Sequence, residues 1–361
     1  MKIAVTSDLH LTSREKHPER FQVLESVLKQ MAEDSIQHLV LAGDVFDAAG
    51  RNYAEFDAVC RKVKSAGIQV WIIPGNHDPG LKQSSFTADN VTVFEKPVLN
   101  QIGATESDFL ENPILFVPYD NERNFGDVLA DFSDKIAEKK WFLVGHGDWI
   151  EGVREPNPYE KGVYMPLGRH DVEKYKPNQV ILGHIHKPTL IENNIIHYCG
   201  SPCSIDINET GRRRFLILDT DSGLIEERII HNGPIYFKVD LLVMPIEDEI
   251  SRVQKQIQQI IDSWELTSEE KNRVSIRVTV RGYSADIRLL SKTVWDAFKE
   301  LQFYNDEGPK LEVSSAYDTD RAEIVKHLET AIDNLGYISG ADDPDRDTIL
   351  FYALKSVYGD K

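Results

Sequence analysis

Short apolar runs recur along the first two-thirds of the chain, and most of them stop abruptly at glycine or polar residues. Runs of this kind are typical of buried β-strands that lead directly into loops. We expect strands at residues 2–6, 38–42, 71–73, 113–117, 141–144, 179–182, 195–199, 215–219 and 225–230. Apolar positions at helical spacing predict helices at 18–31 and 53–65, between the first three strands. This alternation of strands and helices indicates a layered α/β fold.

The last three of these strands are short and close together, which predicts hairpins and an antiparallel half of a sandwich. The pattern changes after Asn232-Gly233-Pro234. Beyond this point we expect strands at 235–242, 274–280 and 311–314, with helices at 246–264 and 287–301 between them. Two further helices are expected at 321–335 and 348–358, on either side of an acidic linker. The chain is therefore predicted to have three parts: residues 1–233, a smaller α/β domain at 234–318, and a helical tail at 319–361.

Polar side chains follow the strands at five separate points of the sequence. The clearest case is Pro74-Gly75-Asn76-His77-Asp78, where an amide, an imidazole and a carboxylate come directly after a strand. The other strand exits carry Asp8 with His10, Asp44, His146, and His184 with His186. Ligands of open α/β sheets gather at the carboxyl ends of strands, so we expect these side chains to meet. A glycine precedes Asp44, Asn76, His146 and His184, where it would let the backbone turn tightly beside a ligand.

The chemistry of these residues fits a metal centre. Imidazole together with carboxylate suits a borderline divalent transition metal such as manganese, iron or zinc. No cysteine joins the set, which argues against a structural zinc site. In an extended chain, the two-residue spacing of Asp8 and His10 would put both side chains on one side. Each motif alone is weak evidence, because a single Gly-Asp is usually just a turn, whereas the ordered set of five is much more specific.

The ordered motifs resemble those of the calcineurin-like metallophosphoesterase superfamily. The further run Leu182-Gly183-His184-Ile185-His186-Lys187-Pro188, followed by Tyr198-Cys199-Gly200-Ser201-Pro202, is similar to SbcD-type DNA-repair exonucleases. The motif match spans residues 1 to about 230. It implies a four-layer metallophosphoesterase β-sandwich flanked by helices, with a smaller α/β cap domain and a short helical C-terminus. Residues 234–318 fit the DNA-recognising cap of that family by size, position and element order.

The resemblance also implies a division of roles within the site. One metal ion would bind Asp8, His10 and His186, the other would bind Asn76, His146 and His184, and Asp44 would bridge the two. His77 would stay off the metals beside the scissile phosphate, with Asp78 as its orienting partner. Two divalent ions would activate a shared water for in-line attack, and the His77 imidazole would protonate the leaving oxygen. Manganese is the expected metal, with iron, zinc or magnesium as the alternatives.

The composition of the chain is ordinary, but its net negative charge bears on whether it binds nucleic acid. The chain has 361 residues, of which 41% are hydrophobic and 28% are charged, as is ordinary for a globular protein. Its net charge is −18, and residues 233–361 alone carry 16 basic and 24 acidic side chains. Such acidity argues against a generally basic nucleic-acid surface and would repel a phosphate backbone at long range. Carboxylates that bind divalent cations are neutralised by them, which accounts for part of the charge.

The sequence shows no sign of a membrane or secreted protein. No apolar run approaches the roughly 20 residues that a membrane helix needs, and no signal peptide precedes the first strand. The three cysteines, Cys60, Cys199 and Cys203, are an odd number without a C-x-x-C pair, which suits a reducing compartment. We therefore expect a cytoplasmic protein without a membrane partner.

Two functions remain open for such a site. The first is a manganese-dependent DNA exo- or endonuclease of the SbcD type, acting on duplex ends or single strands in end processing or repair. The cap-sized second domain favours it, and the resemblance implies a homodimer that works with SbcC, a coiled-coil ATPase. The second is a phosphoesterase acting on nucleotides, cyclic nucleotides or phosphoproteins, which the acidic surface favours. A scaffold on an inactive fold would require lost ligands, and none of the seven is missing.

Substrate and partner contacts are marked less clearly. Arg51, Asn52 and Tyr53 border the expected cleft, so they are candidates for touching substrate. The three arginines at 212–214 could contact phosphates, although such a triplet is more often solvated. The last helix carries Ile349, Leu350, Leu354 and Val357, and it either receives the ATPase or packs back on its own domain.

Overall fold

The chain divides into two compact units in a computed structural model. The structure describes residues 1–47, 52–100, 102, 112–150, 162–191, 194–245, 248–315, 319–337 and 343–358. The first unit comprises Met1–Ile205 and Arg212–Gly233, and the second comprises Asp206–Gly211 and Pro234–Lys361. The predicted cap at 234–318 and the predicted tail at 319–361 therefore lie in the same unit, and their separate roles stay predictions.

The first unit contains two six-stranded sheets. The first sheet has the order β12-β11-β1-β2-β3-β4, in which β1 to β4 run parallel and β11 and β12 are antiparallel to their neighbours. Its strands are β1 (Lys2–Thr6), β2 (His38–Ala42), β3 (Gln69–Ile73), β4 (Val91–Val93), β11 (Arg214–Asp219) and β12 (Ile225–Ile229). The first three predicted strands thus lie side by side, with their carboxyl ends at one edge.

The second sheet has the order β5-β6-β7-β8-β10-β9, with antiparallel strands only at its two edges. Its strands are β5 (Val98–Asn100), β6 (Ile114–Val117), β7 (Phe142–His146), β8 (Gln179–Gly183), β9 (Thr189–Ile191) and β10 (Ile196–Tyr198). The hairpin predicted among the last strands is confirmed for β11 and β12, which are antiparallel to each other on the first sheet. The predicted antiparallel half of the sandwich is wrong, because β10 joins the second sheet and runs parallel to β8. Closely spaced short strands do not reveal that the chain crosses between sheets.

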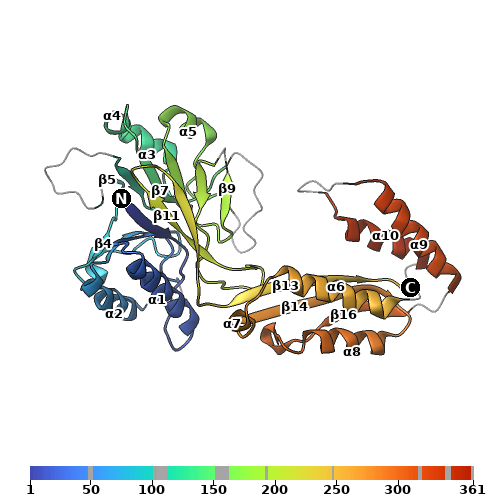
Figure 1. The fold of residues 1–361 in the computed structure, drawn as a ribbon. Helices are drawn as coiled ribbons and strands as arrows, with labels where there is room; N and C mark the ends of the chain where they lie inside the picture. Colours follow the sequence, from blue (N-terminus) through green and yellow to red (C-terminus); the bar gives the residue numbers. More distant parts are fainter. Residues whose placement is uncertain are drawn as a thin grey trace. The chain divides into compact units, whose positions relative to one another are not determined.

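Helices cover the outer face of each sheet, and an apolar layer separates the two sheets (Figure 1). Helices α1 (Pro18–Glu33) and α2 (Tyr53–Val63) pack on the first sheet, and α3 (Phe125–Asp131), α4 (Ser133–Ile136) and α5 (Arg169–Tyr175) pack on the second. Between the sheets lie buried side chains from both, among them Val5, Val40, Phe116, Val144 and Leu216. The four-layer α/β sandwich predicted from the sequence is confirmed.

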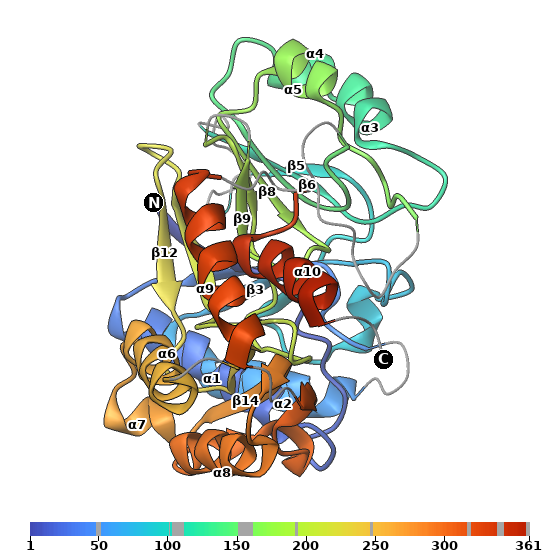
Figure 2. The same ribbon diagram turned by 90° about the vertical axis from the view of Figure 1, so that its right-hand side faces the viewer.

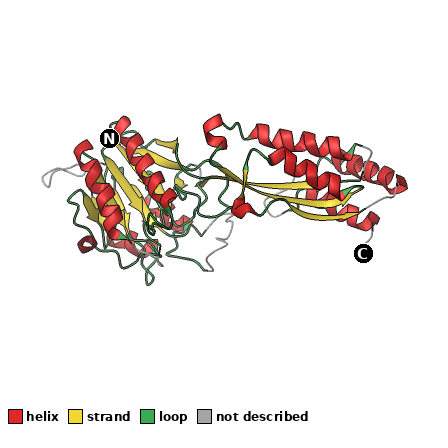
Figure 3. Ribbon diagram, turned by 90° about the horizontal axis from the view of Figure 1, so that it is seen from below, coloured by secondary structure: helices red, strands yellow, loops and turns green. Residues whose placement is uncertain are grey.

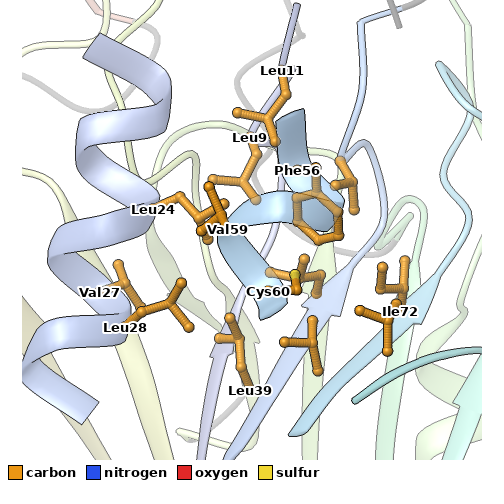
Figure 4. Close-up of a cluster of buried hydrophobic side chains, with 14 of the residues drawn as sticks. Leu9, Leu11, Leu24, Val27, Leu28, Leu39, Phe56, Val59, Cys60 and Ile72 are labelled. Atoms are coloured by element: carbon orange, nitrogen blue, oxygen red, sulfur yellow. The ribbon is translucent and has the colours of Figure 1, made fainter. Parts of the chain in front are cut away.

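The core beneath α1 anchors the first polar loop. Leu24 and its apolar neighbours on α1 face the sheet, and Figure 4 shows Leu24 beside Leu9, which follows β1. Leu9 and Leu11 are 1% and 0% exposed. Burial of each such side chain stabilises the fold by roughly 1.5–3 kcal/mol. The two leucines therefore hold down the loop that carries Asp8 and His10.

The second unit is built on a four-stranded sheet. Strands β13 (Ile235–Val243), β15 (Gln302–Phe303) and β16 (Lys310–Ser315) all run parallel to the central β14 (Val274–Ser284). Helices α6 (Glu249–Ser263) and α8 (Ile287–Phe298) bury their apolar sides along this sheet (Figure 3), and α7 (Ser268–Lys271) is a short connection. Single turns of 3-10 helix lie at Lys64–Ala66 and Gln83–Ser85 in the first unit and at Tyr304–Asp306 in the second.

Within the described ranges, no helix of either unit is long and apolar enough to span a bilayer.

The last two helices, α9 (Thr319–Asn334) and α10 (Arg346–Tyr358), pack side by side (Figure 2). Leu350 and Leu354 of α10 are fully buried in an apolar cluster that includes Met244 and Tyr283 of the second unit. The last helix therefore packs back on its own domain, which is one of the two alternatives given by the sequence. A partner on α10 would have to use its other side, where Tyr352 is 62% exposed.

The buried side of α10 predicts a difference between two substitutions on one helix. Leu354→Ala should lower the free energy of unfolding of the second unit by about 2–5 kcal/mol, because it leaves a cavity in the cluster. Tyr352→Ala should change it by less than about 0.5 kcal/mol, since the side chain is exposed. Denaturant unfolding combined with hydrogen exchange of the α10 amides measures both. Equal stability of the two variants would mean that the cluster does not hold α10 in place.

Candidate metal centre

The carboxyl ends of five strands meet at one edge of the first unit. Strands β1, β2 and β3 are parallel neighbours in the first sheet, and β7 and β8 are parallel neighbours in the second. The sheets touch at this edge, because a Cβ atom on Gly183 would lie 2.1 Å from the carbonyl oxygen of Ala42. The loops bring together the seven predicted ligands and His77: Asp8, His10, Asp44, Asn76, His77, His146, His184 and His186.

Backbone hydrogen bonds tie the loop after β1 to the loop after β2. The amide of Asp8 donates to Gly43 O, and the amide of His10 donates to Asp44 O, each at 3.0 Å. Asp8, His10 and Asp44 have left-handed φ angles of 54°, 45° and 50°. The extended geometry expected for Asp8 and His10 is therefore wrong. Left-handed backbone costs non-glycine residues of order 1–3 kcal/mol each, and such strain clusters at functional sites.

Close contact requires two of the glycines at the strand ends. A Cβ atom on Gly43, whose φ is +90°, would lie 2.1 Å from His146 Nδ1. A Cβ atom on Gly75 would lie 2.2 Å from Asp44 Oδ1. Both neighbours are themselves at most 1% exposed and have no room to withdraw. These glycines let the backbone come within reach of a ligand side chain, as their positions in the sequence predict.

The first donor group consists of Asp8, His10 and His186, whose ligand atoms lie within 4.8 Å of one another. The Nε2 atoms of His10 and His186 are 3.1 Å apart. Asp8 accepts hydrogen bonds from Ser7 Oγ at 2.5 Å and from the backbone amide of His184 at 3.1 Å. Two imidazole nitrogens this close need a proton or a cation between them. The group fits the metal position that the resemblance implies for these three residues.

The second donor group consists of Asn76, His146 and His184. Asn76 Oδ1 lies 2.8 Å from His146 Nε2 and 3.1 Å from His184 Nδ1. His146 Nδ1 donates to the carbonyl oxygen of Ala42 at 2.8 Å, which leaves Nε2 as the metal-binding nitrogen. Ligands bound to one cation at about 2.1 Å are separated by roughly 3 Å, which is the spacing observed.

Asp44 lies between the two groups. Its Oδ2 is 3.3 Å from His146 Nε2 and 3.8 Å from His10 Nε2, so one carboxylate faces both cation positions. His77, half-buried, lies beside it and donates its backbone amide to Asp44 Oδ1 at 2.8 Å. The His77 ring meets the His10 ring edge to face at 4.7 Å. A bridging Asp44 with His77 next to the bridge matches the geometry that the resemblance implies.

The buried donors leave the centre short of positive charge. Burial raises the pKa of Asp8, and burial together with nearby His186 lowers the pKa of His10. Burial also acts to lower the pKa of His146, but the charge and hydrogen bond of Asp44, together with Asp8 and the Ala42 carbonyl, outweigh it and raise this pKa to about 10. Without a cation, a proton on His146 therefore balances the carboxylate. Divalent cations would supply that charge instead, so both the donors and their charge fit a dinuclear metal site.

Asp78 lies directly behind this centre and is 0% exposed. Its Oδ1 accepts a hydrogen bond from the amide of Gly75 at 2.7 Å, and its Oδ2 accepts one from the amide of Phe46 at 3.1 Å. The carboxylate therefore joins the loops after β2 and β3. Burial, with repulsion from Asp44, raises the pKa of Asp78 to about 6. The role predicted for Asp78, to orient His77, stays a prediction. The observed role of Asp78 is to connect two loops.

Sequence reasoning missed Asp148, a carboxylate that is 0% exposed. Its Oδ1 lies 3.5 Å from His184 Nε2, on the side of the ring opposite the donor group. Its Oδ2 accepts a hydrogen bond from the amide of Tyr164 at 2.8 Å. A carboxylate behind a ligating imidazole fixes the orientation of the ring and raises its basicity. The signal was present as the polar residue after Gly147, but its pairing with His184 depends on the fold.

The predicted substrate contacts have structural tasks where they are described. Arg51 lies outside the described residues. Asn52 caps α2, since its Oδ1 accepts a hydrogen bond from the amide of Glu55 at 3.3 Å. The Tyr53 ring packs edge to face on Phe46 at 4.8 Å. Their contact with substrate stays a prediction.

Two tyrosines that the sequence did not single out stand beside the second donor group. The Tyr164 ring lies 4.9 Å from the His184 ring, and the Tyr119 ring lies 6.1 Å from that of Tyr164. The amide of Tyr119 donates to Pro74 O at 3.0 Å, so this residue is tied to the loop that carries Asn76. Both side chains are half-buried and give this side of the centre an aromatic lining.

The chain is similar to known proteins at the level of family, sequence and structure. The family described as calcineurin-like phosphoesterase matches residues 1–188, slightly more than half of the chain. The SbcD subunit of the nuclease SbcCD from Staphylococcus saprophyticus is 24% identical over 270 residues, covering 65% of this chain and 70% of that protein. A dimetal phosphatase from Danio rerio is similar in structure, with a TM-score of 0.42 and 10% identity, over 64% of this chain and 97% of that one.

Asp44 lies between the two donor groups, so replacing its side chain should affect both metal positions. Asp44→Ala should lower the metal content of the purified protein to one ion or none per chain, because both cation positions lose a negative ligand. Elemental analysis of protein purified without chelator measures this. Asp89→Ala, which removes an exposed carboxylate paired with Lys64, is the matched control and should keep the wild-type content. Full occupancy in Asp44→Ala would rule out the bridge.

Proposed function

Because the chain belongs to the calcineurin-like phosphoesterase family, we propose that it is a metal-dependent DNA exo- or endonuclease of the SbcD type. Family membership and the donor geometry make it a metal-dependent hydrolase of phosphate esters. DNA as the substrate rests on the resemblance to SbcD, together with the similarity to the nuclease from Staphylococcus saprophyticus.

One observation carries the proposed chemistry: two donor groups lie side by side and share Asp44. Paired cations about 3.5–4 Å apart can stabilise both the attacking and the leaving oxygen of an in-line displacement at phosphorus. We infer that manganese is the metal, since imidazole, carboxylate and amide donors suit it. Iron, zinc and magnesium are the alternatives that the same donors accept.

Each residue has its own task in such a reaction. One ion would be held by Asp8, His10 and His186, the other by Asn76, His146 and His184, and both by Asp44. When bound, the ions lower the pKa of a shared water and offset the charge of the phosphoryl group. His77 stays off the metals and donates a proton to the leaving oxygen, while its amide fixes Asp44. Asp78 keeps the His77 loop in place through the amide of Gly75.

DNA is the substrate that the wider resemblance favours. By that resemblance residues 234–318 act as a DNA-recognising cap, and the chain forms a homodimer. The cytoplasm is the compartment that the cysteine usage favours. A coiled-coil ATPase similar to SbcC is the partner that it implies. The protein would act on duplex ends or single strands during DNA end processing or repair.

The acidic charge favours a second candidate within the same enzyme class. A chain with a net charge of −18 does not attract a long polyanion through its general field. A nucleotide, a cyclic nucleotide or a phosphoprotein carries fewer phosphates and is repelled less. The two tyrosines beside the second donor group suit any substrate that carries an aromatic ring, so they fit both candidates.

The role assigned to His77 predicts a separation of metal binding from turnover. His77→Asn should lower kcat by at least about 10²-fold, because the leaving oxygen loses its proton donor. Two metal ions per chain should remain bound, because the side chain is not a ligand. Turnover and elemental analysis on the same preparation test both points. Wild-type turnover would refute the role, and loss of one ion would make His77 a ligand instead.

A direct comparison of substrates separates the two candidates. With manganese present, the protein should degrade linear duplex or single-stranded DNA, and Asp44→Ala, as the matched control, should not. A small phosphodiester such as bis(p-nitrophenyl) phosphate and a cyclic nucleotide are tested in parallel. Cleavage of the small esters with no digestion of DNA would exclude the nuclease and leave the second candidate.

A further inference from the structure

We propose that two buried arginines, Arg20 and Arg213, are positioning residues for the first metal position. Each guanidinium donates to the backbone carbonyl of one imidazole ligand, Arg20 to His10 and Arg213 to His186. These are the two histidines whose Nε2 atoms lie 3.1 Å apart. The inference rests on the proposed dinuclear function and says how one half of that centre is held in place.

Arg20 lies in the first turn of α1 and is only 7% exposed. A buried guanidinium is costly unless its charge and its N–H groups are used. Its Nη1 donates to the His10 carbonyl and lies 3.8 Å from an Asp47 oxygen. The backbone of His10 is left-handed, with φ at 45°, so its carbonyl points in a direction that the chain does not prefer. A charge-assisted hydrogen bond at this carbonyl stabilises the unusual conformation.

Arg213 precedes β11 and is 6% exposed. Its Nε donates to Ser201 O at 2.7 Å, and its Nη2 donates to the carbonyl of His186. The amide of Ser201 also donates to His186 O, at 3.0 Å. The planar fork of one guanidinium thus joins the loop after β8 to the loop after β10. This gives Arg213 of the 212–214 triplet a buried structural task, whereas Arg214 pairs with Glu227 at 2.5 Å on the surface.

The ligands of the second metal position are held by other means. His146 Nδ1 is fixed by the Ala42 carbonyl of β2, and His184 faces the carboxylate of Asp148. Loss of a guanidinium should therefore weaken the first position and leave the second intact. Without Arg20, the His10 carbonyl loses its charged donor. Without Arg213, the His186 carbonyl keeps only the Ser201 amide, and the link from this loop to Ser201 O is lost as well.

The sign of the effect distinguishes positioning from simple electrostatics. A buried positive charge near a cation site repels the cation, so its removal alone would strengthen metal binding. Removal of an anchor weakens binding, because the His186 imidazole is no longer held at its place. The two roles thus predict opposite changes in affinity at the first position.

The test uses the full chain, stripped of metal and titrated with Mn²⁺ in a calorimeter, with electron paramagnetic resonance at each step. The wild-type protein should bind two ions whose spins are coupled. Arg213→Met should keep one ion at wild-type affinity and bind the other about 10–100-fold more weakly, as expected for loss of an outer support. At one equivalent its signal should be that of an isolated ion. Arg20→Met should give the same pattern through His10.

Arg214→Met is the matched control, since it removes the neighbouring arginine without touching a ligand loop, and it should bind two ions as the wild type does. Unchanged or tighter binding in Arg213→Met would overturn the inference, and so would equal weakening at both positions. A wild-type chain without a coupled pair would instead refute the proposed dinuclear function. If Arg213→Met does not fold, Arg213→Lys replaces it. The ammonium has all its donors on one nitrogen and lacks the planar fork that joins the two loops, so wild-type affinity in that variant would also overturn the inference.

Discussion

Buried donor atoms about 3 Å apart repel one another unless positive charge lies between them. The fold of the first unit must hold these donor atoms together against that repulsion. The carboxylates of Asp8 and Asp44 and the imidazoles around them are at most 3% exposed, with only His186, Asn76 and His77 nearer the surface. Water cannot screen such a group well. Cations between the donors would remove this repulsion, and this links the fold directly to the chemistry.

Apolar packing and close backbone contact act together with hydrogen bonds to hold the donors in place. Leu9 and Leu11 are buried under α1, and they fix the loop after β1 that carries Asp8 and His10. Gly43 and Gly75 allow the loops of the first sheet to come within van der Waals distance of His146 and Asp44. Strained backbone at the ligands is tolerated because hydrogen bonds from neighbouring loops fix it on both sides.

The sequence predicted much of this, because strand ends and ligand types are local properties. A short apolar run that stops at glycine followed by Asp, Asn or His contains both the strand and the donor, so β1, β2, β3, β7 and β8 could be located together with their polar exits. The pairing of distant residues could not be located in this way. Asp148 behind His184, and Arg20 behind His10, depend on which loops the fold brings together. The crossing between sheets after β10 escaped prediction for the same reason, whereas for Leu350 and Leu354 the sequence allows both alternatives and the fold selects one.

The net negative charge of the chain and the local charge at the metal positions affect substrate binding differently. Long-range attraction to a polyanion is a property of the whole surface, whereas binding of one phosphoryl group is a property of a few ångströms around the metal position. Two divalent ions would offset four of the negative charges, and Arg20 and Arg213 place two more cations against the first donor group. A locally positive centre in an acidic protein favours a substrate that is captured by its reacting phosphate. If the substrate is DNA, the remaining affinity must come from close contacts of the second unit or from a basic partner, because the general field of this chain does not provide it.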